Sequence, residues 1–136
     1  MSKAKGSRTE RELFHKLWAE GWATIRAAGS GSTTRPCPDL LASNGTRTLA
    51  IECKALKDSK KYFESREIEE LISFSSGFGA EAWIGIRFDS KDWFFVLASD
   101  VPQSKGKRLV LTMDFVQKEG KKFEELLGKF EQSRLF

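Results

Sequence analysis

The amino-acid sequence predicts an α/β fold in which a central mixed β-sheet is flanked by α-helices. Residues 7–20 and 64–76 carry apolar side chains at the spacing of amphipathic helices, and the short apolar runs between and after them are typical of strands. Of the 136 residues, 40% are hydrophobic and 12% are aromatic. We therefore expect a single domain over residues 1–136, beginning with a flexible basic segment over residues 1–5.

The composition favours a cytoplasmic protein with a polyanionic partner. Lysines and arginines number 23 against 19 acidic residues, which gives a formal net charge of +4. No apolar run approaches the length of a membrane span, and the N-terminus is polar, so we expect no membrane contact. Cys37 and Cys53 lack CxxC spacing and His15 is the single histidine, so they cannot complete a zinc site. A reduced cysteine pair is favoured, with a disulfide left open.

The first expected helix begins with the segment Ser7-Arg8-Thr9-Glu10, which has the form of a capping box with Ser7 as N-cap. The helix runs to about Glu20 and ends at Gly21. Glu10 lies on or beside the apolar stripe, which comprises Leu13, Phe14, Leu17 and Trp18. By itself Glu10 would be read as a capping residue, but an inward carboxylate beside further carboxylates favours a role in a site.

A short strand is expected over residues 22–26, followed by the most polar loop of the chain, residues 27–38. The simplest interpretation of this loop is a connector. It carries Ser30 and Arg35, which suit phosphate contacts, and it ends directly at Asp39. We therefore also consider a flap that becomes ordered on substrate.

The segment from Pro38 to Lys54 predicts a β-hairpin, because Asn44-Gly45 is a strong signal for a tight type I′ turn. On its second strand, alternation places Glu52 and Lys54 on one face with Thr48 and Ala50. The opposite face carries Leu49, Ile51 and Cys53. The hairpin can bring Asp39 close to Glu52 and Lys54.

Of the remaining elements, the helical tail is expected to be structural. A basic loop over residues 57–62 precedes the second helix, which runs from about Glu64 to Ser76 and is stopped by Gly77 and Gly79. Strands are expected at residues 82–88, 93–97 and 109–112, with a turn at 89–92 and a helical tail around 123–127. We place the candidate site at one edge of the sheet.

Two acids and a lysine in this arrangement suit metal-assisted cleavage of a phosphodiester. Mg²⁺ prefers oxygen ligands and keeps several waters, so one or two carboxylates can hold it. Asp39 and Glu52 are the expected ligands, the Cys53 backbone carbonyl is a plausible third, and Glu10 would add a ligand or hold a bound water. Lys54 would orient the nucleophile or offset negative charge in the transition state. Mn²⁺ is the expected substitute for Mg²⁺.

The motif is short: Pro-Asp, twelve intervening residues, then Glu-x-Lys. Its alternative interpretation is an acid at a turn followed by a strand with an exposed Glu-Lys face. The hairpin context and the upstream Glu10 favour the site.

Longer segments give a more specific signal. The run Lys5 to Leu13, the run Arg26 to Ser30, Pro38-Asp39-Leu40 and Ile51-Glu52-Cys53-Lys54 together resemble the archaeal Holliday junction resolvases. These belong to the PD-(D/E)xK, or type II restriction endonuclease-like, nuclease superfamily. The resemblance covers Lys5 to about Leu97 and is weak after Pro102. Within it, the loop containing Arg35-Pro36-Cys37-Pro38 departs from the family pattern.

The resemblance implies a restriction endonuclease-like nuclease domain that acts as a Mg²⁺-dependent homodimer on four-way DNA junctions. It implies paired symmetric nicks across the branch point, in homologous recombination and repair. Its catalytic residues would be Glu10, Asp39, Glu52 and Lys54, with Ser30 assisting, and Phe74 and Phe78 would lie in the dimer interface. The expected DNA contacts are Lys5, Arg8, Arg11, Arg26, Arg35, Lys57, Lys60, Lys61 and Arg87.

Two alternatives are open. One is another PD-(D/E)xK endonuclease that acts on linear duplex, although the chain has little room for a separate recognition domain. The other is a DNA-binding module that keeps the nuclease fold without activity, which the presence of Glu10, Asp39, Glu52 and Lys54 argues against.

Overall fold

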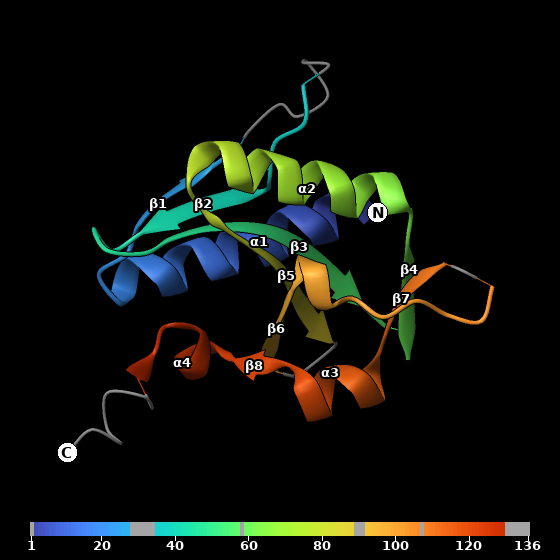
Figure 1. Ribbon diagram of the computed structural model, residues 1–136. Helices are drawn as coiled ribbons and strands as arrows, with labels where there is room; N and C mark the ends of the chain where they lie inside the picture. The colour runs from blue at the N-terminus through green and yellow to red at the C-terminus, as the bar shows by residue number, and fades with distance from the viewer. Residues whose placement is uncertain (1, 28–34, 58, 89–91, 107, 130–136) are drawn as a thin grey trace.

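The computed structural model describes residues 2–27, 35–57, 59–88, 92–106 and 108–129, with side chains from Arg8 onward (Figure 1). Its elements in chain order are α1 (Ser2–Ala19), β1 (Ala23–Arg26), β2 (Leu40–Ser43), β3 (Thr48–Leu56), β4 (Lys60–Phe63), α2 (Ser65–Phe78), β5 (Glu81–Phe88), β6 (Trp93–Leu97), the 3₁₀ turn η2 (Ala98–Asp100), β7 (Leu109–Thr112), α3 (Met113–Glu119), β8 (Lys121–Lys122) and α4 (Phe123–Leu126).

The main sheet is mixed, as the sequence predicts. Its strand order is β1-β2-β3-β5-β6-β8, and the pairing of β3 with β5 is parallel while the other neighbours pair antiparallel. α2 makes the crossover between β3 and β5, which parallel neighbours require. A second, two-stranded sheet consists of β4 and β7.

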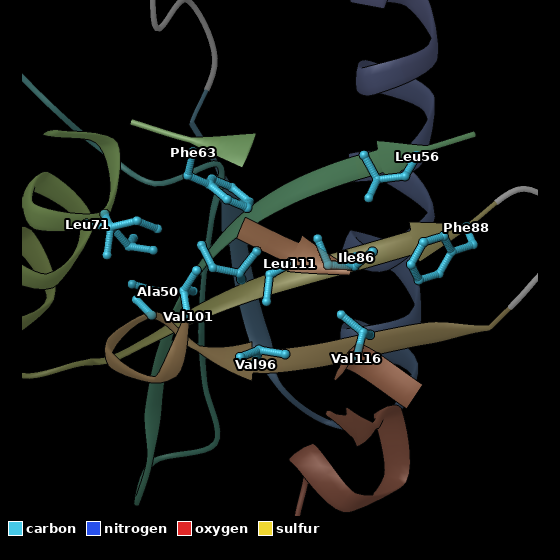
Figure 2. Close-up of a cluster of buried hydrophobic side chains, with 13 residues drawn as sticks. Ala50, Leu56, Phe63, Leu71, Ile86, Phe88, Val96, Val101, Leu111 and Val116 are labelled. Carbon is cyan, nitrogen blue, oxygen red and sulfur yellow. The ribbon is translucent and has the colours of Figure 1, made fainter. Parts of the chain in front are cut away.

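The two long helices cover opposite faces of the main sheet (Figure 1). On one face, Leu13 and Leu17 of α1 pack with Leu49 and Ile51 of β3. On the other, Ile68 and Leu71 of α2 belong to a cluster that includes Ala50 and Leu56 of the same strand, together with residues of β4, β5, β6, β7 and α3 (Figure 2). The predicted alternation of side chains along β3 is thereby confirmed. Burial on both faces fixes the register of this strand, because a slip of one residue would exchange the two sets.

The start of the first helix differs from the prediction. α1 begins at Ser2, so Ser7 lies within the helix and is not its N-cap, and residues 2–5 are helical where a flexible segment was expected. Lysine and alanine at these positions favour helix, and one glycine costs only about 1 kcal/mol. The expected end of the helix is confirmed, since Gly21 follows it with a φ of 84°.

The hairpin of β2 and β3 is confirmed, but its turn is longer than a two-residue type I′ turn. Ser43 pairs with Thr48, which leaves four residues between the strands. The Asn44 side chain explains the difference: its Oδ1 accepts hydrogen bonds from the backbone N–H groups of Thr46 (2.9 Å) and Arg47 (2.7 Å). An asparagine that satisfies two loop amides stabilises a wider turn.

Three further elements differ from the prediction. Lys60–Phe63, expected within a basic loop, is a strand that pairs with β7, and α3 was not expected at all. Gly77 lies inside α2, and only Gly79 caps it, with a φ of 80°. The strands at 82–88, 93–97 and 109–112 and the helix near 123–127 are confirmed within one or two residues. Most of the turn at 89–92 lies outside the described residues.

The C-terminal elements are attached to the hairpin by Arg47. Its guanidinium donates to both carboxylate oxygens of Glu81, each at 2.8 Å, and to the backbone carbonyl of Leu126 at 2.7 Å. The paired guanidinium lowers the pKa of the Glu81 carboxyl. Phe123 and Leu126 of α4 pack in the same core cluster as α1, so this part of the chain completes the core.

Candidate active site

The candidate site lies at the start of β2, where β3 continues beyond the paired part of the hairpin. The last pair of the β2–β3 ladder joins Leu40 with Ile51, so β3 extends past β2 from Glu52 to Leu56. Beyond that pair the backbone N–H of Cys53 donates to Oδ2 of Asp39 at 2.8 Å. The Asp39 carbonyl in turn accepts from the N–H of Ala27 at 2.9 Å. A side-chain carboxylate thus takes the place of the next strand partner.

This arrangement also orients the Cys53 carbonyl, the expected third metal ligand. The N–H and C=O of one strand residue point toward the same neighbouring strand, so the Cys53 carbonyl faces the same side as Asp39. The Cys53 side chain lies on the opposite, α1-facing cluster, and burial raises the pKa of its thiol. Sulfur is therefore kept protonated and out of the site. Both Cys37 and Cys53 are free thiols.

Asp39, Glu52 and Lys54 are brought together as the hairpin predicts. Burial, followed by repulsion from Asp39, raises the pKa of the Glu52 carboxyl to about 8. Burial likewise raises the pKa of Asp39 to about 6, against the hydrogen bond from Cys53 that lowers it. Lys54 Nζ lies 3.9 Å from Glu52 Oε2. Two buried acids with raised pKa values beside a lysine are typical of a functional site.

Glu10 enters the site from α1, on the side of β1. Its Oε1 is 3.1 Å from Nε of Arg26, the last residue of β1, and both side chains are half-buried. Glu10 raises the pKa of both Asp39 and Glu52, although it is the weakest of the charged neighbours acting on Glu52. The predicted inward orientation of Glu10 is confirmed, while its carboxylate is paired with Arg26.

The site lies one strand in from the sheet edge, which corrects the expected position. β1 is the edge strand, whereas Asp39 directly precedes β2 and Glu52 lies on β3, the second and third strands. The open backbone is that of β3 beyond Ile51, not an edge strand along its whole length.

The donor set fits a magnesium ion only in part. Two carboxylates and a backbone carbonyl on one side of β3 are oxygen ligands of the kind Mg²⁺ takes, with waters completing its shell. Among the described residues, no group of three or more His, Cys, Asp or Glu side chains could hold a metal ion as they stand. Asp39 and Glu52 are therefore the fitting pair, and Glu10 would have to leave Arg26 to join them.

One acidic neighbour was missed by sequence reasoning. Glu67, in the first turn of α2, places Oε1 3.5 Å from Lys54 Nζ, and it raises the pKa of Glu52. The sequence feature that could have identified Glu67 is its position three residues after Glu64, which is the spacing of a capping box, and the structure contains this capping box. A cavity of about 130 Å³ adjoins this position, and its lining includes Glu52, Glu67 and Glu70.

The expected DNA contacts fall into three groups. Exposed side chains are those of Arg8, Arg11, Arg35, Lys57 and Lys60, while Lys61 is half-buried. Arg26 and Arg87 are half-buried in ion pairs, the latter with Glu12 at 2.6 Å. Ser30 and the side chain of Lys5 lie outside the described residues.

Beside the expected DNA contact Lys60 lies Arg108, a basic residue that was not among the expected contacts. The guanidinium of Arg108 lies 4.2 Å from the ring centre of Tyr62, and Lys60 Nζ lies 5.5 Å from the same ring. Neither cation forms a salt bridge with an acid in the described part of the chain. Cations held by a ring and unpaired with acids remain available to phosphate.

Phe74 and Phe78 stack on α2, with ring centres 5.4 Å apart and planes inclined by 17°. Phe78 is 56% exposed, and the nearby Ile72 is 37% exposed. A stacked aromatic pair at the surface is costly to leave in water and is typical of a contact surface.

Among the described residues, no helix is both long enough and apolar enough to cross a membrane.

Comparison with known proteins identifies a family with which this chain shares its sequence over almost its whole length. The family model described as archaeal Holliday junction resolvase (Hjc) matches residues 1–135, so the likeness extends through the tail after Pro102. A crossover junction endodeoxyribonuclease Hjc of Archaeoglobus fulgidus is 40% identical over 132 residues, covering 97% of this chain and 96% of its own. The Hjc of Methanocaldococcus jannaschii is 34% identical over 134 residues, covering 96% of this chain and 92% of its own.

A solved structure agrees with these sequence matches. The structure of Archaeoglobus fulgidus Hjc, a Holliday junction resolvase, superposes with a TM-score of 0.82 at 36% identity. The match covers 89% of this chain and 98% of that one.

The raised pKa values predict how stability depends on pH. A carboxyl whose pKa is higher in the folded state holds its proton more tightly there, so folding stability falls as pH rises between the unfolded and folded values. Those windows are 3.8 to about 6 for Asp39 and 4.5 to about 8 for Glu52. We expect the metal-free protein to lose thermal stability from about pH 5 to pH 8, and Glu52→Gln to raise the melting temperature at pH 8 by on the order of 5 °C.

Differential scanning calorimetry in chelator at several pH values checks this. Glu69→Gln, which removes an exposed carboxyl from the same protein, serves as the matched control and should follow the wild-type pH dependence. If wild type and Glu52→Gln showed the same pH dependence, the pKa of Glu52 would not be raised in the folded protein.

Proposed function

The chain belongs to the archaeal Holliday junction resolvase family, and we propose that it is a structure-selective endonuclease that cuts four-way DNA junctions by paired, symmetric nicks. The observation that carries the proposal is the group of Asp39, Glu52 and Lys54 where β3 extends past the end of β2. This is the arrangement that phosphodiester cleavage requires: oxygen ligands for a cation and a fixed positive side chain.

Mg²⁺ is the proposed cofactor, with Mn²⁺ as substitute. Asp39 and Glu52 would hold the ion, with the Cys53 carbonyl facing the same side and Glu10 as a further ligand or a partner for a bound water. When bound, such an ion activates a water molecule and offsets negative charge on the phosphate. The raised pKa values support this role, because a cation near both carboxylates would favour the ionised forms that burial disfavours.

Lys54 is the residue of the chain that supplies a positive charge in the site, in addition to the proposed metal ion. Its ammonium lies beside Glu52 and belongs to the same strand, two residues on, so it faces the same side of the sheet. A lysine ammonium so placed stabilises negative charge that develops on the transferred phosphate, and it can orient the attacking water. Ser30 lies outside the described residues, and the family resemblance alone proposes it as an assisting residue.

The proposed DNA surface surrounds this site. Arg8 and Arg11 are exposed on α1, within a turn of Glu10. Arg108, just before β7, lines one cavity with Phe63 and Glu67, and Lys60 of β4 shares the Tyr62 ring with Arg108. Contacts of this kind bind phosphates without reading bases. They suit a substrate that is recognised by its branched shape.

A homodimer is proposed from the surface of α2. Phe74 and Phe78 give this helix an exposed apolar end, and burying it against the same surface of a second copy would form a two-fold interface. Two equivalent sites related by a two-fold axis match the symmetry of a four-way junction, in which equivalent strands face each other.

The proposed substrate preference and the proposed role of Asp39 can be tested together. With Mg²⁺ or Mn²⁺, the wild-type protein should cut a fixed four-way junction and leave a linear duplex of the same sequence intact. Asp39→Asn should reduce cutting by roughly 100-fold or more while junction binding persists, because asparagine keeps an oxygen for the Cys53 N–H but loses the charge. Labelled junction and duplex, followed by denaturing gels and mobility shifts, measure both.

Asp114→Asn is the matched control, because Asp114 is exposed on α3 and pairs only weakly with Lys118. It should cut as wild type does. Equal cutting of linear duplex by the wild type would indicate a general nuclease of the same fold. Tight junction binding without cutting in either metal would leave a non-catalytic binding module.

The second prediction concerns the dimer. Replacing both Phe74 and Phe78 by alanine should convert the dimer to monomer, since most of the apolar contact surface at this end of α2 is lost. Sedimentation velocity measures the change. Trp18→Ala, which removes a half-exposed aromatic from α1 on the opposite face of the sheet, should leave the dimer intact. A dimer that survives the double replacement would place the interface elsewhere.

A further inference from the structure

Glu67 makes two separate contacts with its two carboxylate oxygens. Oε1 lies 3.5 Å from Lys54 Nζ, and Oε2 accepts a hydrogen bond of 3.2 Å from the backbone N–H of Glu64 at the start of α2. The second contact belongs to a capping box, which ties the side chain to the helix end. Glu67 therefore reaches Lys54 from a fixed position rather than as a free surface chain.

Lys54 is held between two acids from different elements. Glu67 approaches it more closely than Glu52, which lies at 3.9 Å on the same strand. The ring of Phe63 lies beneath, with its centre 5.9 Å from the ammonium. A lysine side chain has many rotamers, so an ammonium with a single neighbouring charge would not be confined. The contacts from β3, β4 and α2 define one place for it.

The position of Glu67 also decides what Glu52 can do. If Lys54 rested on Glu52 alone, the ammonium would occupy an oxygen that a divalent cation requires. A second carboxylate on α2 draws the ammonium toward the helix and leaves Glu52 available. We propose that Glu67 is a positioning residue that holds the Lys54 ammonium in the active site. The inference rests on the proposed function for its catalytic consequence, but its structural part can be tested without cleavage.

The chain offers a variant that separates this role from helix capping. Glutamine at a capping-box position still accepts the N–H bond, so Glu67→Gln keeps the helix end and removes only the charge. Glu70 is the matched control. It lies one turn further along α2, pairs with Arg66 at 3.0 Å, and borders the same cavity without a salt bridge to Lys54.

The structural test measures the mobility of the lysine. In metal-free protein, NMR relaxation of the Lys54 Cε methylene reports its order on the ps–ns timescale. We expect this order parameter to fall in Glu67→Gln and to remain at the wild-type value in Glu70→Gln, with unchanged melting temperature in both. An unchanged order parameter in Glu67→Gln would overturn the proposal whatever the protein does to DNA.

The catalytic test uses junction cleavage under single-turnover conditions. Glu67→Gln should slow cleavage roughly tenfold or more with unaltered junction affinity, since a misplaced catalytic group affects the chemical step and not binding. Glu67→Asp should recover part of the loss. In a Lys54→Ala background the further change Glu67→Gln should have no effect, because Glu67 acts through Lys54.

The outcomes are distinguishable. Equal slowing by Glu67→Gln in the presence and absence of Lys54 would show that Glu67 acts directly and would overturn the positioning role. Wild-type protein that fails to cut junctions would contradict the proposed function, while the NMR comparison would still decide whether Glu67 holds Lys54.

Discussion

The hydrogen bond from the Cys53 N–H to the Asp39 carboxylate is the constraint on which the rest of the site depends. The pairing of β2 with β3 extends no further than Leu40, the first residue of β2, and Pro38, two residues earlier, has no backbone N–H to offer a sheet. The backbone of β3 would be left unpaired at this point, at a cost comparable to a lost hydrogen bond. Asp39 satisfies it at 2.8 Å and is thereby fixed beside Glu52. One contact both terminates a strand pair and positions an acid.

Electrostatic repulsion between neighbouring acids destabilises the fold at this site. Burial raises the pKa of Asp39 and of Glu52, and neighbouring carboxylates raise both further. Lys54 at both acids, and Arg26 at Asp39, only partly offset this rise. What holds the acids together is packing elsewhere, since β3 is buried on both faces by the clusters of α1 and α2. Strain of this kind is typical of functional sites and is maintained because the surrounding core over-determines the geometry.

Local sequence signals predicted the elements well where apolar spacing and turn chemistry agree. The alternation along residues 48–54 fixed the faces of β3, and with them the grouping of Glu52 and Lys54 opposite Cys53. The strand at Lys60–Phe63 was missed because its partner, β7, lies almost fifty residues away, and a charged edge strand has no periodicity of its own. The contacts of Glu10, Glu67 and Arg108 were likewise missed, since ion pairs and cation–ring contacts between distant elements leave no pattern along the chain.

The location of a bound metal ion decides whether Asp39 and Glu52 form the cation site. Crystals of the protein soaked in Mn²⁺ and measured at a wavelength with manganese anomalous scattering would locate the ion. We predict an anomalous peak between the carboxylates of Asp39 and Glu52, on the side that the Cys53 carbonyl faces, and the loss of this peak in Glu52→Gln. A peak at another acidic cluster, such as Glu12 with Asp92, together with an empty Asp39–Glu52 pair, would contradict it.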